Sequence, residues 1–235
     1  MTPSYQTDAA PAHVGLILDG NRRWAKSQGL ASLEGHIRGY HNLRTIARHF
    51  IAERGVSCLS AYVFSTENWR RSAREVSYLM KLVSRALGEY LDEFHRDNIR
   101  IVVLGSRRGL KQSVLASIEK AESATAGNTG GTLALCFNYG GQQEITDALK
   151  AALSAKKPPR ALSAEEFQEY LYNPEIPPLD LIIRTSGEQR LSGFMLFRSA
   201  YAELYFTAKH WPAFTVDDAD AALAEFARRR RRFGR

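Results

Sequence analysis

The chain has few of the residues that mark disulfide-rich, membrane-spanning or low-complexity proteins. Its 235 residues include two cysteines, eight prolines and three methionines. Cys58 and Cys136 both lie in apolar, strand-like runs, which predicts buried free thiols and supports neither a disulfide framework nor a metal site. No apolar run reaches the length that a bilayer-spanning helix requires. With 44% hydrophobic and 24% charged residues, the composition is that of an ordinary globular protein.

The two ends of the chain differ in character. The first twelve residues, MTPSYQTDAAPA, lack the basic and apolar segments of a secretory signal. They predict a flexible tail over 1–12, followed by one domain over 13–235, in a cytoplasmic protein. Much of the net charge of +7 comes from the arginine run 228–232. That run can bind nucleic acid, acidic lipid or phosphorylated small molecules, or it can be a solvated helix end.

Six apolar, strand-like runs alternate with helical segments. Continuous apolar runs are typical of strands whose two faces are both covered. Apolar residues spaced by three and four predict helices, most clearly over 72–97 and also over 144–153, 164–171 and 216–228. The alternation predicts a single α/β domain with a central, mostly parallel six-stranded sheet flanked by helices. The strands are expected at 13–18, 58–64, 99–104, 132–137, 180–184 and 203–206.

The segments that follow these strands share a chemical character. In open α/β sheets, ligands bind outside the carboxyl ends of the strands. Here those ends are rich in arginine, glycine and hydrogen-bonding side chains, which together predict a cleft for a phosphate or diphosphate. The segments are 19–24, 65–71, 105–109, 138–141, 184–192 and 207–212.

Several common phosphate and metal motifs are missing. The chain has no G-x-x-x-x-G-K-[ST] loop, no G-x-G-x-x-G after the first strand and no H-E-x-x-H pair. The acidic run at 217–220 is followed by Ala221, so it is not a D-D-x-x-D motif. What remains is Asp19 beside arginines. A carboxylate next to bound phosphates calls for a cation such as Mg²⁺, although Asp19 can also serve as a helix N-cap.

Several long motifs occur in a fixed order from about His13 to the C-terminus. They are HVGLILDGNRRWA (13–25), EGHIRG (34–39), FSTENWRR (64–71), FNYGGQQEI (137–145), IIRTSGEQRLSGFMLFRSAYAELYF (182–206) and RRFG (231–234). Together these motifs resemble those of the cis-prenyltransferases, the family of undecaprenyl diphosphate synthase.

The resemblance implies an enzyme that condenses isopentenyl diphosphate with an allylic diphosphate to give a Z-polyprenyl diphosphate. Asp19 and Asn68 would be catalytic, and Asp19 and Glu203 would hold Mg²⁺. The allylic diphosphate would bind at the first segment and the isopentenyl diphosphate at a later one, with a mobile loop between them. The implied substrate-binding residues are Gly20, Asn21, Arg22, Arg23, Trp24 and His36; Ser65, Thr66, Glu67, Trp69 and Arg71; Arg184, Arg190, Leu191 and Ser192; and Arg232 and Gly234.

The family is a homodimer, so the resemblance also implies that Arg232 and Gly234 reach the neighbouring subunit's site. This use of the arginine run is favoured over nucleic-acid binding. A long product would imply peripheral contact with a membrane and a role in making the bacterial cell-wall lipid carrier. Val63 and Tyr78 lie where larger side chains could shorten the product tunnel. A long-chain product is nevertheless expected.

Three positions depart from the family pattern, and alternatives stay open. Ser32 replaces an arginine that helps bind diphosphate, and Gly193 and Phe197 replace an asparagine and a tryptophan of the long-chain bacterial enzymes. The alternatives are a short-chain, farnesyl-type synthase, an irregular enzyme that joins two allylic units, and a non-catalytic partner subunit. The last of these is disfavoured because Asp19, Asn68 and Trp69 are all present.

Overall fold

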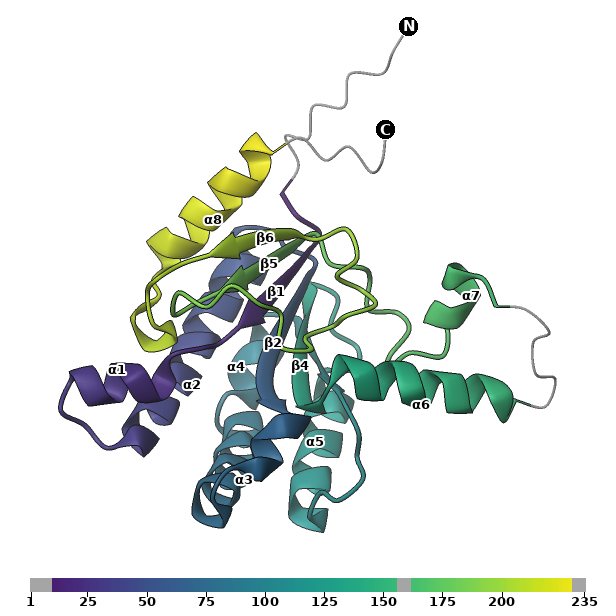
Figure 1. Ribbon diagram of the computed structural model, residues 1–235, viewed down its shortest axis with the longest axis horizontal. Helices are drawn as coiled ribbons and strands as arrows, with labels where there is room; N and C mark the ends of the chain where they lie inside the picture. The colour runs from purple at the N-terminus through teal and green to yellow at the C-terminus, as the bar shows by residue number, and fades with distance from the viewer. Residues whose placement is uncertain (1–9, 156–161, 230–235) are drawn as a thin grey trace, which may run out of the picture.

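The computed structural model describes residues 10–155 and 162–229. Six parallel strands form one sheet in the order β3-β4-β2-β1-β5-β6 (Figure 1). This confirms the predicted strands to within two residues and the predicted α/β architecture. The strands are β1 His13–Ile17, β2 Cys58–Ser65, β3 Ile99–Leu104, β4 Gly131–Tyr139, β5 Leu181–Arg184 and β6 Glu203–Phe206.

Helices connect the strands, and the parallel order requires each connection to cross over the sheet. The α-helices are α1 Asn21–Ser27, α2 Ser32–Arg48, α3 Ala73–Glu89, α4 Leu91–Arg96, α5 Gln112–Thr125, α6 Gly141–Leu153, α7 Ala164–Gln168 and α8 Val216–Arg228. Short helical turns of other types are η1 His49–Glu53, η2 Thr66–Arg70 and η3 Trp211–Ala213. Within the described ranges, none of the helices has the length and apolar character needed to cross a bilayer.

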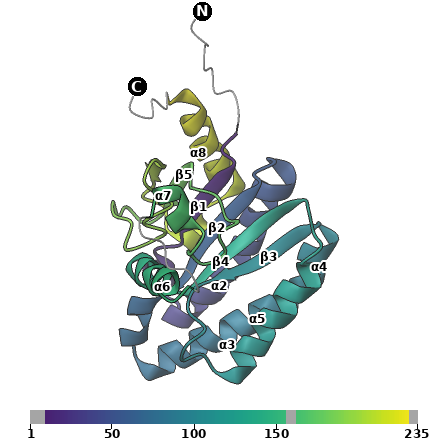
Figure 2. The same ribbon diagram turned by 90° about the vertical axis from the view of Figure 1, so that its right-hand side faces the viewer.

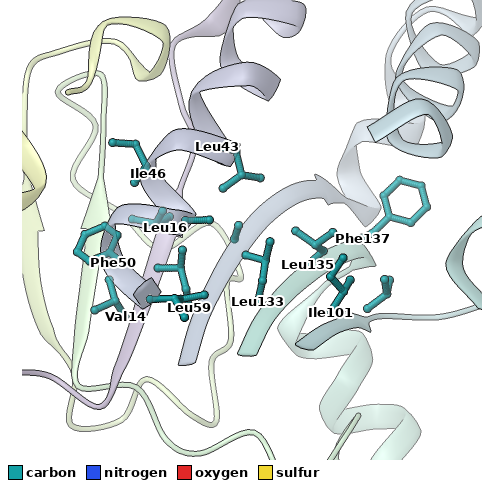
Figure 3. Packing of buried hydrophobic residues seen from close by; sticks show 14 of the residues in the cluster. Val14, Leu16, Leu43, Ile46, Phe50, Leu59, Ile101, Leu133, Leu135 and Phe137 are labelled. Carbon is teal, nitrogen blue, oxygen red and sulfur yellow. The ribbon is translucent and has the colours of Figure 1, made fainter. Parts of the chain in front are cut away.

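The two faces of the sheet are covered differently. One face packs against α2, α3, α4, α5 and α8 in a large apolar core. Figure 3 shows Val14, Leu16 and Leu59 of the central strands against Leu43 and Ile46 of α2. The other face packs against the chain between β4 and β6 and contains both cysteines, which are buried and free as predicted. Burial raises the pKa of the Cys58 thiol to about 12, so this thiol stays protonated.

The long helix predicted over 72–97 is broken at Tyr90. Tyr90 has φ −107° and ψ 7°, and it separates α3 from α4. The apolar stripe nevertheless continues across the break, because Val76, Leu79, Leu87 and Phe94 are all buried in the same core. Figure 2 shows α3, α4 and α5 together beside β3 and β4. The helix predicted over 164–171 ends at Gln168, and that predicted over 216–228 is confirmed.

Candidate functional site

The turn after β1 places Asp19 at the carboxyl edge of the sheet. Gly20 has φ +100°, a conformation that favours glycine, and it is the N-cap of α1 without a side-chain cap. A Cβ at Gly20 would lie 2.6 Å from the Ser186 hydroxyl, so no larger residue fits here without a shift. The predicted alternative, Asp19 as a helix cap, is therefore wrong. Its carboxylate instead accepts a hydrogen bond from the Gly20 amide at 2.7 Å.

Two arginines from different elements meet the Asp19 carboxylate. Arg184, at the end of β5, donates to one oxygen at 3.0 Å, and Arg23 of α1 lies 3.1 Å from the other. Burial alone raises the pKa of Asp19, but the hydrogen bonds and charges of Arg184 and Arg23 outweigh it. The net pKa lies below its ordinary value. Asp19 is therefore ionised at neutral pH.

Arg184 organises the segment that follows β5. Its side chain is only 4% exposed. It donates to the Ser192 hydroxyl at 2.8 Å and to the Arg190 carbonyl, while its Nε has no partner within the described residues. A buried guanidinium with an unused donor is suited to bind a further oxygen anion. The predicted grouping of Asp19, Arg184 and Ser192 is thus present in the structure.

A second charged cluster lies around Glu75, near the start of α3. Its carboxylate accepts from Arg71 at 2.9 Å and lies 3.4 Å from the His36 ring and 3.7 Å from Arg22. Burial, and then the charge of Arg71, lower the pKa of His36, so its imidazole is neutral at pH 7. Sequence reasoning missed Glu75, which lies in the first turn of α3 and pairs with Arg71 just before that helix begins.

The loop between β2 and α3 folds over the site. The Asn68 side chain accepts from the Ser65 amide at 3.1 Å, as part of a capping box that starts η2. The Trp69 indole donates to Asn138 at 2.7 Å, and Asn138 donates in turn to the Ser106 carbonyl at 2.7 Å. Asn138 lies in the predicted strand-end segment 138–141, but its partners come from two other segments, so its role in holding Trp69 could not be predicted from that segment alone. It ties the loop to the end of β4.

Three connected hollows share Leu18 and Arg71. An apolar cavity lies between α2, α3 and the sheet, with about 1,090 Å³ of empty space including its open mouth. A first polar lobe and a second polar lobe open beside it, and Asp19 lines both lobes. The first lobe is lined by Asp19, Gly20, Asn21, Arg22, Arg23, Lys26, Ser32, His36 and Arg71, among others. The second is lined by Asp19, Ser65, Glu67, Asn68, Arg71, Gln142, Arg184, Ser192, Gly193 and Leu196, among others.

The lobes contain most, but not all, of the predicted residues. Arg190 lines neither lobe, because its half-exposed guanidinium pairs with Glu188, which also binds Arg23 at 2.9 Å. Leu191 packs against the second apolar core and acts as a packing residue. Trp24, Thr66 and Trp69 also lie outside the lining of the three hollows. Arg232 and Gly234 lie outside the described residues.

Glu203 is placed at the opposite edge of the sheet from Asp19. Glu203 is the first residue of β6 and pairs with Leu181 of β5. Arg184, which contacts Asp19, lies three residues further along β5, or about 10 Å along the strand from Leu181. The Glu203 carboxylate pairs with Arg229 at 2.9 Å. Within one chain Glu203 therefore lies away from Asp19, and the expectation that Glu203 holds Mg²⁺ stays a prediction. Among the described residues, no three His, Cys, Asp or Glu side chains gather into a metal-binding group.

Two of the three departures from the family pattern lie at the lobes. Ser32 lines the first lobe together with Lys26, which supplies a positive charge there. Gly193 lines the second lobe and has φ +77°. Phe197 instead packs against Phe167, with ring centroids 5.2 Å apart.

The chain was compared with protein-family models, with curated proteins and with solved structures. The Prenyltransf family model, described as undecaprenyl diphosphate synthase, matches residues 17–234. The chain belongs to this prenyltransferase family. An isoprenyl transferase 2 of Bradyrhizobium diazoefficiens is 44% identical over 96% of this chain and 90% of its own length. An isoprenyl transferase of Thermotoga maritima is 44% identical over 95% of this chain and 97% of its own length.

Solved structures share the prenyltransferase fold. Lavandulyl diphosphate synthase from Lavandula x intermedia, crystallised with dimethylallyl diphosphate, is 33% identical. It superposes with a TM-score of 0.91 over 96% of this chain and 99% of its own. A probable undecaprenyl diphosphate synthase from Campylobacter jejuni is 30% identical, with a TM-score of 0.80 over 97% of this chain and 100% of its own. The cis-prenyltransferase resemblance of the sequence is thus confirmed for the family and the fold.

Proposed function

We propose that this prenyltransferase condenses isopentenyl diphosphate with an allylic diphosphate, geranyl or farnesyl diphosphate, to form a Z-polyprenyl diphosphate. The observation that carries the proposal is the position of Asp19 between two basic lobes that open into one apolar cavity. Two diphosphates and one growing hydrocarbon chain match this shape. The first lobe, nearer α1 and His36, takes the allylic diphosphate. The second, around Arg184 and Ser192, takes isopentenyl diphosphate.

The donor set around Asp19 fits a bound Mg²⁺. Mg²⁺ prefers one or two carboxylates together with substrate phosphates and water, and Asp19 is ionised and lines both lobes. When bound, the ion supplies charge neutralisation to the leaving diphosphate. Arg184 and Arg23 already hold the Asp19 carboxylate in a fixed position, so the protein orients this ligand before substrate arrives.

The residues of the chain would promote the reaction mainly by orientation and charge. Arg22, Arg23 and the amides that open α1 stabilise the diphosphate as its bond to the allylic carbon breaks. The alkene of isopentenyl diphosphate then attacks that carbon, and a proton leaves to form the new double bond. Asn68 lies at the shared mouth, but a neutral amide is a poor base. The departing diphosphate or a water molecule therefore takes the proton, and Asn68 orients the reacting chain.

The first experiment is incorporation of labelled isopentenyl diphosphate with Mg²⁺ and, separately, geranyl or farnesyl diphosphate. Products are sized by mass spectrometry after removal of the diphosphate. Incorporation that depends on the allylic primer and is lost in Asp19→Asn supports the proposal. Asp180→Asn is the matched control, because Asp180 binds backbone amides at residues 12 and 13, away from both lobes. Failure of the wild-type chain to incorporate label contradicts the proposal.

Irregular condensation of two allylic units is the second candidate. It is supported by the TM-score of 0.91 with a lavandulyl synthase that binds dimethylallyl diphosphate, and by Ser32 in the first lobe. Incubation with dimethylallyl diphosphate alone separates the two reactions. A coupled product without isopentenyl diphosphate favours the irregular enzyme, whereas a product that requires isopentenyl diphosphate excludes it as the main activity.

Assembly and chain length belong to the same proposal. A homodimer in which residues 231–235 complete the partner's site would explain the C-terminal arginine run. Membership of the undecaprenyl diphosphate synthase family supports a long product, a peripheral membrane contact and a role in cell-wall lipid synthesis. The shorter, farnesyl-type product is the alternative that the sequence left open.

A further inference from the structure

Residues 207–212 follow the edge strand β6 and line neither polar lobe, although the sequence predicts them as part of the ligand-binding edge. The segment crosses the end of β5, where the Lys209 carbonyl accepts a hydrogen bond from the Ser186 amide at 2.7 Å. It then reaches the end of β1, where the Trp211 amide donates to the Asp19 carbonyl at 2.9 Å. Because β5 lies between β1 and β6, this segment connects the edge of the sheet to the Asp19 turn.

The Asp19 carbonyl has a second donor in Thr185, the first residue after β5. The Thr185 hydroxyl donates to this carbonyl at 2.7 Å. Thr185 is buried, with 1% exposure, and lines none of the three hollows. A carbonyl oxygen has two lone pairs, and Thr185 and Trp211 together use both. Because one donor already satisfies a buried carbonyl, the second donor restricts the direction in which this oxygen can move.

The Asp19 turn needs such attachments because the backbone is least constrained directly after Asp19. Gly20 has φ +100°, and glycine restricts the backbone less than any other residue. Its own strand contributes a hydrogen bond of 2.9 Å from the Asp19 amide to the Ile17 carbonyl. The donors of Thr185 and Trp211 attach the same turn to β5 and to the segment after β6.

The side-chain partners of Asp19 are themselves expected to change when substrate binds. Arg184 and Arg23 hold the carboxylate in the substrate-free protein. Under the proposed function both guanidinium groups also bind diphosphate, and phosphate oxygens compete with the carboxylate for the same donors. Thr185 lines neither lobe, so a bound diphosphate does not reach its hydroxyl. The hydrogen bonds to the Asp19 carbonyl therefore persist when the arginines turn to substrate.

Trp211, the other donor, is fixed against α2. Its indole donates to the Gly39 carbonyl at 2.7 Å, and its own carbonyl accepts from the Asn42 side chain at 2.8 Å. Trp211 is 1% exposed. The Asp19 main chain is thus attached to β5 through Thr185 and to α2 through Trp211. Rigid elements of this kind can hold a reacting group to within a fraction of an ångström.

The backbone directly after Thr185 is held in an uncommon conformation. Ser186 has φ +78°, which few residues other than glycine adopt. Its hydroxyl is hydrogen-bonded to His210 at 2.7 Å, and its carbonyl accepts from Arg23 at 3.2 Å. Such residues persist where surrounding contacts over-determine them, and they cluster at functional sites. These contacts fix the backbone beside Thr185, and with it the direction of the Thr185 hydroxyl.

We propose that Thr185 is a positioning residue for the condensation reaction and that it acts through Asp19. Its hydroxyl fixes the main chain at Asp19, and thereby the place of the carboxylate between the two lobes. This inference rests on the proposed function. Because Thr185 does not line the lobes, its loss should slow the reaction of bound substrates rather than weaken their binding.

The test replaces Thr185 by valine, which keeps the volume of the side chain but lacks the hydroxyl. Full-length proteins are incubated with labelled isopentenyl diphosphate, Mg²⁺ and geranyl diphosphate, and initial rates give kcat and both KM values. Because Trp211 still donates to Asp19, kcat should fall by about 10-fold, less than the ~100-fold that a misplacement of about 1 Å can cost. Both KM values should stay within about twofold. Thr185→Ser restores the hydroxyl and should restore most of kcat.

A stability control separates positioning from general damage. Thr125 is also fully buried, and its hydroxyl donates to the Ala121 carbonyl at 2.8 Å and accepts from the Ile101 amide at 2.9 Å, away from the hollows. Thr125→Val should keep the wild-type kcat, whereas both valine variants should lower Tm by about 2–4 °C. Thr185→Ala tests the same hydroxyl if Thr185→Val fails to fold.

A double-mutant cycle with Asp19→Asn tests whether Thr185 acts through Asp19. Residues that act as a unit have non-additive effects on rate. In the Asp19→Asn background, Thr185→Val should therefore lower the residual kcat by less than about twofold. A residue that supports the fold in general would instead lower kcat by the same factor in both backgrounds.

The outcomes separate the inference from the proposed function. The inference is overturned, with condensation intact, by a wild-type kcat in Thr185→Val, by failure of Thr185→Ser to restore the rate, by an equal loss in Thr125→Val, or by a loss that multiplies with that of Asp19→Asn. Absence of any incorporation by the wild type overturns the proposed function, and the inference with it. A loss of kcat that requires Asp19 and is reversed by serine supports both.

Discussion

Replacement of Arg198 by methionine should destabilise the protein strongly and weaken binding in the second lobe. Arg198 and Glu144 form an ion pair at 2.6 Å, and both side chains are 0% exposed. Arg198 also donates to the carbonyls of Tyr172 at 2.7 Å and Ile176 at 3.1 Å. Its removal leaves a buried carboxylate and buried carbonyls without their donor. Breaking one half of such a pair costs about 3–5 kcal/mol.

Loss of Arg198 should also disturb the second lobe, because Arg198 belongs to the same segment as two of its lining residues. Arg198 fixes the segment that contains Ser192 and Gly193, and the Gly193 carbonyl accepts from the Gly141 amide at 2.8 Å at the start of α6. Loosening this segment moves lining residues of the second lobe, so the KM for isopentenyl diphosphate should rise more than that for the allylic substrate.

Urea and thermal unfolding measure the stability change. For a chain of this size, about 3–5 kcal/mol corresponds to a fall in Tm of about 6–20 °C. The double variant Arg198→Met, Glu144→Gln should recover part of the loss, because it leaves no uncompensated charge. Arg100→Met is the matched control, since the Arg100–Glu175 pair at 3.1 Å is exposed and should contribute at most about 1 kcal/mol. A loss in Arg198→Met as small as that of the control would refute the reasoning.

The remaining predictions concern charge, pH, the loop and the C-terminus. Asp19→Asn should lower kcat/KM by about 100-fold or more while the protein stays folded, as measured by initial rates and circular dichroism. Burial lowers the pKa of His13 to about 4 from an ordinary value of 6.5, so the folded protein binds fewer protons than the unfolded chain between these values. Stability should therefore fall by up to about 3 kcal/mol as pH falls through this window, and less in His13→Gln, as followed by urea titrations. Asn138→Ala removes the acceptor of the Trp69 indole and should raise KM values and alter Trp69 fluorescence without a change in product length. Removal of residues 231–235 should raise KM for isopentenyl diphosphate, and unchanged steady-state kinetics would contradict their role in the site.

The fold was predictable because its strands are buried on both faces. Continuous apolar runs such as 133–137 are buried at every position, and this pattern is typical of a sheet covered on both sides. The break at Tyr90 was not predictable in the same way. The apolar spacing continues through it, and the Tyr90 hydroxyl is held by His41, a residue 49 positions away. Local periodicity contains no information about such a partner.

The site residues that directly follow a strand were predictable from the sequence. Residues that follow a parallel strand gather at one edge, and Asp19 and Arg184 do meet there. The same rule places Glu203 at the other end of the strands, because this residue begins β6, and its predicted role as a metal ligand came from the family resemblance alone. Arg190 also follows a strand, but its side chain pairs with Glu188 outside both lobes. The direction of a side chain depends on its local partners, which the order of the strands does not determine.

The carboxylates that hold the cationic residues were missed for a physical reason. Glu75 contacts three cationic or titratable side chains of the first lobe, and Glu188 pairs with Arg23 and Arg190. A cleft that binds two diphosphates concentrates positive charge, and that charge is unfavourable in the substrate-free protein unless nearby anions offset it. Such anions lie behind the lining, so motifs that describe substrate contacts do not point to them. Each diphosphate must then compete with a carboxylate for the same cations, which makes substrate affinity depend on Glu75 and Glu188 as well as on the arginines themselves.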